Sequence, residues 1–335
     1  MPSDRPRDHP RRVNLIAWDN GVGLGRDLRL LARHLAAVGV QARILAYRRD
    51  KPGKWLDAAR ARLRGLLCRV GLAPRADANL HLEHIRPEYR HLARRNLLVP
   101  NPEWFGRRSE QLLGMIDGVL AKTRQAEHAF AALGRPVAFC GFTSEDRLDT
   151  AVERTPTFFH LAGRSLTKGT AVLLETWRRH PEWPPLTVVQ SPDRAAAAES
   201  TANIEHRVEY LDDVQLRSLQ NRHLFHLCPS EAEGFGHHLV EALSVGAIVL
   251  VTDGAPMNEL VSPERGILIP WESSAPLRRG VGYRVAVAGI ERAVEQALAL
   301  DAGRRQALSA AARAFYLAND AAFPARLRAA IEALL

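Results

Sequence analysis

Residues 229–261 read PSEAEGFGHHLVEALSVGAIVLVTDGAPMNELV, and this stretch predicts the organisation of the chain around it. The apolar run just before it, residues 224–228, predicts a buried strand that ends at Pro229-Ser230. A loop with two glycines follows, and a helix is expected from His237. Glycines let the backbone approach a ligand closely, and the free N–H groups at a helix start favour a phosphate. The segment therefore predicts an anion site between a strand and a helix.

The same alternation of short apolar runs and helical patterns extends along the whole chain. We expect strands at 13–18, 42–47, 79–84, 96–100, 118–121, 137–140, 158–162, 186–190, 208–210, 224–228, 248–251 and 266–269, and helices at 26–38, 170–179, 214–220, 237–245 and over most of 287–335. Strands that alternate with helices indicate parallel βαβ units. The sequence therefore predicts an α/β protein.

The pattern restarts after the charged stretch 144–156, which suggests two domains in a chain of 335 residues. We expect an N-terminal domain over residues 1–150 and a C-terminal domain over 151–335, each doubly wound and Rossmann-like, facing each other across a cleft. The C-terminal helices are expected to pack back on the first domain. Ligands in such sheets bind at the carboxyl ends of the strands.

Composition narrows the class of protein. Hydrophobic residues make up 46% and charged residues 25%, which is typical of globular proteins. No apolar run is long enough for a transmembrane helix, and the polar N-terminus is not a secretory signal. Cysteines number three and form no CxxC pair, so disulfides and a zinc site are not expected. We expect a cytoplasmic protein.

Two carboxylates flank the start of the helix in the opening segment. Glu233 lies just before the helix and Glu241 about one turn inside it, so both can face a ligand at the strand ends. A carboxylate accepts hydrogen bonds from two hydroxyls. One is therefore expected to hold a donor sugar and the other a ribose.

This segment resembles the retaining glycosyltransferases of family 4, which have the two-domain GT-B fold and an E-x7-E signature. The matching residues are Glu233, Gly234, Phe235, Gly236, Glu241, Ala242 and Gly246, with agreement also at Pro229, Ser230 and residues 247–251. The resemblance implies that Glu233 is the catalytic residue at the donor sugar and that Glu241 binds the ribose. The loop and the backbone of His237 and His238 are expected to bind the donor diphosphate.

A second match is the run 163–169, GRSLTKG, after the first strand of the C-terminal half. The resemblance implies that Arg164 and Lys168 bind the diphosphate, which has to be neutralised as it leaves. A third, weaker match is the loop GVGLG at 21–25, where Gly23 is expected to approach the diphosphate; a tight turn without a ligand remains an alternative. The loop also resembles a nicotinamide-binding turn. However, Arg26 takes the place of its third glycine, and no acidic residue follows the second strand, so a dehydrogenase is not expected.

The acceptor side is less clearly marked. Family members often carry a histidine after a central strand of the first domain, where this chain has Asn101. Asn101, Glu103 and Trp104 form a polar and aromatic loop suited to a sugar acceptor, or one that packs on its own tryptophan. His84 lies at a neighbouring strand end and is a further acceptor-side candidate, although a histidine in a strand is more often a structural core or edge residue.

Metal and nucleic acid are not expected as partners. His237 and His238 have an HxxE spacing to Glu241, but a third ligand is missing, and no Asp-x-Asp occurs in the chain. Residues 1–70 hold 16 Lys and Arg against 6 Asp and Glu, a net charge of +10, and the remaining residues sum to −1, which gives +9 for the chain. No nucleic-acid-binding motif accompanies this charge. Residues 54–70 predict a basic amphipathic helix, which either packs as a surface helix or contacts the inner face of an anionic membrane.

The sequence therefore predicts a metal-independent, retaining glycosyltransferase that uses a nucleotide-sugar donor and no other cofactor. The nucleotide base, the sugar and the acceptor remain open, and the acceptor is a glycan, a lipid-linked sugar or a small molecule. Two alternatives remain. One is a nucleotide-sugar epimerase or a phosphorylase of the same fold, and the other is a non-catalytic module that binds a nucleotide sugar or glycan.

Overall fold

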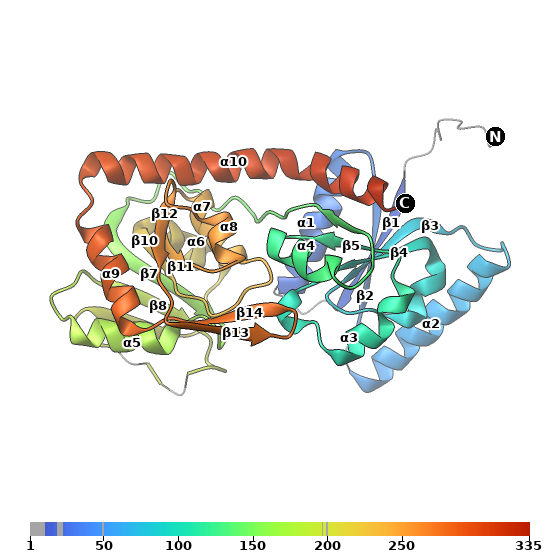
Figure 1. Cartoon of the computed structure of the whole chain (residues 1–335), viewed down its shortest axis with the longest axis horizontal. Coiled ribbons are helices and arrows are strands. Elements are labelled where there is room, and N and C mark those ends of the chain that lie inside the picture. The colour runs from blue at the N-terminus through green and yellow to red at the C-terminus, as the bar shows by residue number, and fades with distance from the viewer. Residues whose placement is uncertain (1–10, 19–22, 49, 196, 199) are drawn as a thin grey trace. The chain divides into compact units, whose positions relative to one another are not determined.

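The computed structural model describes residues 11–18, 23–48, 50–195, 197–198 and 200–335, and divides the chain into two compact units (Figure 1). The N-terminal unit comprises Met1–Phe142 together with Ala321–Leu335, and the C-terminal unit comprises Thr143–Asp320. The chain passes between the units after Phe142 and again within the long helix α10 (Ala302–Ala333). The last turns of α10 therefore belong to the N-terminal unit, and the first passage precedes the expected boundary at residue 150.

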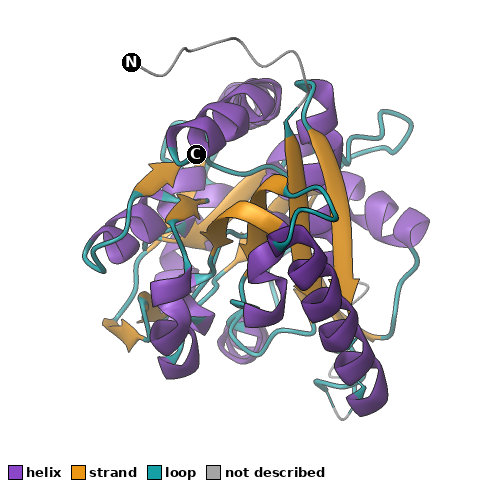
Figure 2. Cartoon of the chain, turned by 90° about the vertical axis from the view of Figure 1, so that its right-hand side faces the viewer, coloured by secondary structure: helices purple, strands orange, loops and turns teal. Residues whose placement is uncertain are grey.

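The N-terminal unit contains a parallel sheet of six strands, in the order β2-β1-β3-β4-β5-β6. The strands are β1 (Arg12–Trp18), β2 (Gln41–Tyr47), β3 (Ala76–Leu82), β4 (Ala93–Val99), β5 (Gly118–Ala121) and β6 (Val137–Phe139). The helices are α1 (Gly23–Ala37), α2 (Lys51–Arg69), α3 (Arg107–Leu112) and α4 (Arg124–Ala131), with short 3-10 turns η1 (Pro87–Leu92), η2 (Pro102–Trp104) and η3 (Leu113–Met115). Figure 2 looks onto this unit and shows helices on both sides of the strands.

The strand order of this sheet reverses between β1 and β3, which pair directly. Chain order runs outward from β1 to β2 on one side and from β3 to β6 on the other. Such a reversal leaves a crevice beyond the carboxyl ends of the two strands, and ligands of open α/β sheets bind there. The loop after β1 and the segment after β3 are therefore the expected ligand-binding positions of this unit.

The C-terminal unit contains a second parallel sheet of six strands, in the order β12-β11-β10-β7-β8-β9. The strands are β7 (Thr155–Gly163), β8 (Leu186–Gln190), β9 (Ile204–Val208), β10 (His223–Cys228), β11 (Ile248–Thr252) and β12 (Gly266–Ile269). The helices are α5 (Thr170–Arg179), α6 (Asp213–Arg222), α7 (His237–Ser244), α8 (Met257–Leu260) and α9 (Val287–Leu298), besides α10. The order reverses between β7 and β10, so both predicted donor loops follow strands at the reversal.

The core of the C-terminal unit forms under α5 and α9. Phe158 of β7 stacks on Phe225 of β10 at 4.9 Å between ring centroids, and Trp177 of α5 packs edge-on against Phe158 at 5.0 Å. All three side chains are fully buried. Burial of such large rings stabilises the unit by a few kcal/mol for each side chain, and fixes β7 and β10 side by side.

Most elements begin and end within a few residues of the expected positions, but two predictions need correction. The strand expected at 208–210 is β9, which spans Ile204–Val208, because Ile204 and His206 point into the core while Glu205 is exposed. The hairpin of β13 (Ser273–Leu277) and β14 (Gly280–Arg284) was not predicted, because its residues are exposed and lack an apolar run. None of the helices in the described residues is long and apolar enough to span a bilayer.

Candidate functional site

The loops that follow β7 and β10 meet at the strand reversal of the C-terminal unit. The Glu231 N–H donates to the Thr167 carbonyl at 2.8 Å, which ties the two loops together. Gly169, with φ of +68°, lies so close to the second loop that a Cβ on it would sit 2.3 Å from the Pro229 carbonyl oxygen. Glycine is required there because no side chain fits and because its backbone conformation is left-handed.

Lys168 lies at the centre of this junction. Its ammonium donates to Glu233 Oε1 at 2.5 Å and to Nδ1 of His238 at 3.0 Å. Lys168 and Glu233 are largely buried, with side chains 13% and 12% exposed. Burial and then the Lys168 charge hold the pKa of His238 well below its usual value, so the ring is neutral and free to accept. The cluster thus joins three predicted site residues, and Ser230 Oγ lies 3.4 Å from His238 Nε2.

His160 of β7 helps to position the segment that carries Lys168. Its Nδ1 donates to the Leu227 carbonyl at 2.8 Å, so its Nε2 accepts from the hydroxyl of Thr170 at 2.9 Å. Burial lowers the pKa of His160 to about 4, which keeps the ring neutral. Because Thr170 is the first residue of α5, His160 fixes the start of that helix directly after Lys168.

The glycine loop enters α7 through a left-handed residue. Gly236 has φ of +99° and precedes the first residue of α7, His237. Phe235 is buried and packs edge-on against the His237 ring at 5.4 Å between centroids. His237 Nδ1 lies 2.6 Å from the Ser144 hydroxyl. His237 and His238 therefore contact different partners, and Gly234 lies in the loop that connects them to Glu233.

Glu241 lies inside the C-terminal unit. Its side chain is 2% exposed, and its Oε2 accepts from the Gln220 amide at 2.9 Å. The side-chain oxygen of Gln220, Oε1, in turn accepts from Arg147 Nε at 2.9 Å. Glu241 is thus separate from the hydrogen-bonded Lys168 cluster, and its predicted contact with a ribose remains a prediction.

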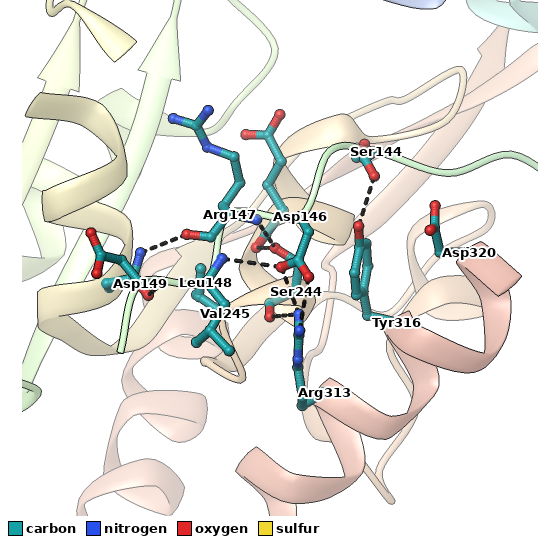
Figure 3. A network of polar contacts seen from close by, with 12 residues as sticks. Ser144, Asp146, Arg147, Leu148, Asp149, Ser244, Val245, Arg313, Tyr316 and Asp320 are labelled. Carbon is teal, nitrogen blue, oxygen red and sulfur yellow. Dashed lines mark hydrogen bonds and ion pairs between the residues drawn. The ribbon is translucent and has the colours of Figure 1, made fainter. Parts of the chain in front are cut away.

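The segment that enters the C-terminal unit, residues 143–149, carries Ser144, the partner of His237, and Arg147, which donates to Gln220. Figure 3 shows how it is held: Arg313 of α10 donates to both carboxylate oxygens of Asp146, at 2.6 and 2.8 Å, and the Tyr316 hydroxyl donates to the Ser144 carbonyl at 3.0 Å. The Arg147 N–H donates to Ser244 Oγ at 3.0 Å. Sequence analysis missed Ser144 and Arg147 because no motif marks them; their role depends on contacts distant in sequence.

Arg164 does not join the Lys168 cluster. Its guanidinium is about half exposed, 3.6 Å from an Asp193 oxygen and within hydrogen-bonding distance, 3.3 Å, of the Tyr210 hydroxyl. It also lies over the Tyr210 ring. Since these contacts are exposed and weak, the side chain can turn to a phosphate at small cost.

The hairpin β13–β14 is attached to the loop after β10, a feature that sequence analysis did not predict. The Tyr283 N–H donates to the Glu231 carbonyl at 2.8 Å. The Tyr283 ring covers Gly254, where a Cβ would lie 2.5 Å from it. Next to it, the Trp271 indole donates to the Asp253 carbonyl at 2.7 Å. The hairpin therefore borders the ends of β10 and β11.

The acceptor-side candidates lie after β3 and β4, neighbouring strands of the N-terminal sheet. His84 follows Glu83, a non-glycine residue with φ of +63°, and the His84 N–H donates back to Leu82 at 2.7 Å. Asn101 precedes η2, and its buried Oδ1 has no hydrogen-bond donor among the described residues. Glu103 and Trp104 lie in η2, and Trp104 is 53% exposed. A left-handed non-glycine residue at a strand end is often found at functional sites.

Other predictions concern the first loop and metal binding. Residues 21 and 22 of the loop at 21–25 lie outside the described residues, and Gly23 is the first residue of α1. Within the described part of the chain, no group of three His, Cys, Asp or Glu side chains is arranged to hold a metal ion. The cysteines Cys68, Cys140 and Cys228 are free and buried.

Part of this chain matches a family of glycosyltransferases in sequence, and the whole chain matches solved glycosyltransferases in fold. Residues 156–282 match the family model described as glycosyl transferases group 1. A search of curated proteins found no match. Among solved structures, a glycosyltransferase from Rickettsia africae has a TM-score of 0.71 at 14% identity, covering 97% of this chain and 98% of its own.

Two further structures extend this comparison. A sucrose-phosphate synthase from Thermosynechococcus elongatus has a TM-score of 0.70 at 14% identity, covering 97% and 99% of the two chains. Anabaena HepE, solved with UDP and glucose, has a TM-score of 0.66 at 11% identity, covering 96% and 100%. The fold is thus the GT-B fold of glycosyltransferases, as predicted, and residues 156–282 are similar in sequence to the group 1 glycosyltransferases.

Proposed function

We propose that this protein is a retaining glycosyltransferase of family 4 that moves a hexose from a nucleotide sugar. The observation that carries the proposal is the cluster of Lys168, Glu233 and His238 at the strand reversal of the C-terminal sheet. A largely buried ion pair adds little stability, because desolvation offsets most of its Coulomb energy, so its position at the strand reversal supports a functional role. The roles that we propose follow from the E-x7-E signature, in which Glu233 contacts the donor sugar and Glu241 contacts the ribose.

In the proposed mechanism, Lys168 neutralises Glu233 while the site holds no donor. When a nucleotide sugar binds, its diphosphate competes for the Lys168 ammonium, and Glu233 becomes free to accept hydrogen bonds from the sugar. Glu233 then stabilises the positive charge that develops at the anomeric carbon, and Lys168 stabilises the leaving diphosphate. Arg164 and the N–H groups at the start of α7 complete the diphosphate site, and Glu241 holds the ribose.

We further propose that fixed protein charges replace a divalent ion in this reaction. His237 and His238 are engaged by Ser144 and Lys168 rather than by a common centre, which supports the proposal. Three structures of similar fold hold UDP or a UDP sugar, so a UDP sugar is the first donor to test. Asn101, Glu103, Trp104 and His84 are the proposed acceptor-side residues.

We propose that α2 brings the protein to the cytoplasmic face of a membrane. Half of the fourteen exposed large hydrophobic side chains among the described residues lie on α2 and just after it: Trp55, Leu56, Leu63, Leu66, Leu67, Val70 and Leu72. Arginines are interspersed among them at 60, 62, 64 and 69. Apolar side chains of this kind insert among lipid chains while arginines contact anionic headgroups.

The test is a transfer assay with UDP-, GDP- and ADP-sugars, comparing the native protein with Glu233→Gln. Turnover should fall at least ~10-fold, because a contact that strengthens in the transition state is worth more than ~1.4 kcal/mol. Affinity for the nucleoside diphosphate should stay unchanged or increase, because Lys168 no longer has a competing carboxylate. A chelator should not change turnover. The anomeric configuration of the product, determined by NMR, reports retention.

Several outcomes of this assay would contradict the proposal. Full turnover by the Glu233→Gln variant removes Glu233 from the mechanism, and activity that needs a divalent ion contradicts transfer by fixed charges. Release of free nucleotide with a different sugar, without an acceptor, indicates an epimerase. A requirement for inorganic phosphate indicates a phosphorylase, and nucleotide binding without any turnover indicates a binding module.

A further inference from the structure

A pocket of about 540 Å³ lies wholly within the N-terminal unit and has no role in the donor site. Its walls come from α2, from the segment after β3 that leads into η1, and from α3. The volume is in the range of small-molecule sites. One wall begins at His84, directly after β3, which is one of the two strands at the reversal of this sheet. The pocket therefore borders a position where open α/β sheets bind ligands.

The charge of this pocket is strongly positive. Lys54 and Arg62 of α2 and Arg108 of α3 line it, and none of the three has an ion-pair partner among the residues that the structure describes. The carboxylate in the wall, Glu88, is paired with Arg86 at 2.5 Å. Arg86 also lies over the Tyr47 ring at 4.2 Å, which fixes this pair in place. Three cations without counter-charges thus face a common space.

The pocket also has an apolar side. Trp55, Ala58, Ile85 and Leu112 line it, and the Trp55 side chain is 76% exposed. Trp55 begins the row of exposed apolar residues on α2, so the pocket is continuous with that surface. A ligand that fits these walls combines a compact anion with an apolar part.

We propose that this pocket binds the phosphate group of the acceptor. A phosphate carries up to two charges and several strong acceptor oxygens, so it can bond to several cations at once, which a single carboxylate does less well. The inference rests on the proposed transfer function, because it assigns the substrate class of the second substrate. The phosphate belongs either to a lipid headgroup or to a soluble phosphorylated compound, and the experiment below separates the two sources.

The test measures binding directly, without a donor. The probes are vesicles of phosphatidylcholine with 30% phosphatidylglycerol, vesicles of phosphatidylcholine alone, and soluble glycerol 3-phosphate. The variants are Arg108→Ala and Arg62→Ala, with Arg107→Ala and Arg94→Ala as matched controls. Arg107 lies beside Arg108 on α3 and Arg94 lies on β4; both are exposed, and neither lines the pocket. All four variants change net charge equally, so non-specific attraction to an anionic surface falls equally in all of them.

Binding should weaken at least ~10-fold in Arg108→Ala and Arg62→Ala and by less than ~2-fold in the controls, since a charge-assisted contact is worth roughly 1.5–3 kcal/mol. If binding of glycerol 3-phosphate weakens in this pattern, a soluble phosphorylated compound is enough to fill the pocket. The same dependence with anionic vesicles alone identifies a lipid headgroup. Equal weakening in all four variants, or binding of neither probe, overturns the proposal. Because no donor is present, these results are independent of whether sugar transfer is demonstrated with the Glu233→Gln comparison.

Discussion

Lys168 donates to Glu233 and His238, so its replacement should change both the free energy of unfolding and the affinity for a nucleoside diphosphate. Lys168→Met leaves the largely buried Glu233 without a cation, which should cost roughly 1–3 kcal/mol of unfolding free energy. Arg164→Ala should change unfolding free energy by less than ~0.5 kcal/mol, because that side chain is about half exposed. Both variants should bind nucleoside diphosphate at least ~10-fold more weakly while binding the nucleoside almost normally.

Calorimetric titration with UDP and uridine, together with chemical unfolding, separates these effects. The double variant with Lys168→Met and Glu233→Gln serves as a control, since it leaves neither charge alone and should recover most of the lost stability. Equal loss of affinity for nucleoside and diphosphate would show that Lys168 and Arg164 lie away from the phosphates. Stability that fails to recover would show that the ion pair itself is not the cause.

For single residues, the sequence predicted which side chains belong to the candidate site better than it predicted which side chains they contact. The spacing of Glu233 and Lys168 within their motifs predicted that both belong to one site, and the structure brings the two side chains together. It did not predict that Glu241 would be buried against Gln220, or that Ser144 would contact His237. Those contacts join residues 21 to 93 positions apart, and no local pattern encodes them.

Helices with a regular apolar spacing were predicted closely, whereas the exposed hairpin was not. The helix expected at 170–179 is α5, with the same bounds, because Leu173, Leu174 and Trp177 follow a helical spacing and are all buried. The strands β13 and β14 carry no alternating apolar pattern, and they form through backbone pairing and the anchoring of Tyr283. Packing against the donor loops, rather than intrinsic propensity, determines this element.

Tyr283 should therefore determine how firmly the hairpin holds the Glu231 loop. Tyr283→Ala removes the ring over Gly254 and should lower unfolding free energy by about 1–2 kcal/mol, with weaker nucleotide binding of at least ~3-fold. Gly254→Ala should have a similar effect, because the new methyl group collides with the same ring. Arg284→Ala, on the same strand but 78% exposed, is the control and should be neutral. Normal nucleotide affinity in Tyr283→Ala and Gly254→Ala would show that the hairpin does not support the donor loop.

For the molecule as a whole, buried histidines are concentrated in the C-terminal unit. Burial lowers the pKa of His160 and His223 to about 4 and that of His226 to about 3. Among the described residues of the N-terminal unit, His34 and His81 are buried, and burial lowers the pKa of His81 to about 4. The two units carry the same type of sheet, so the difference in histidine content should make their acid stabilities differ.

Acidification should therefore unfold the C-terminal unit first. Below pH 6.5 the unfolded chain takes up protons that the folded unit excludes, so stability is complete above that pH and is lost as the pH falls toward 4. Each histidine contributes roughly 1.4 kcal/mol per pH unit, and three contribute roughly 4 kcal/mol per pH unit. Unfolding midpoints in denaturant at pH 7.5, 6.0 and 5.0 measure this dependence. Tryptophan fluorescence of tryptophan-to-phenylalanine variants assigns each transition to a unit, because Trp177 and Trp183 lie in the C-terminal unit and Trp18 lies in the N-terminal unit. His226→Gln should reduce the proton uptake by about one. A C-terminal transition with the same midpoint at all three pH values would show that these histidines are already protonated in the folded protein.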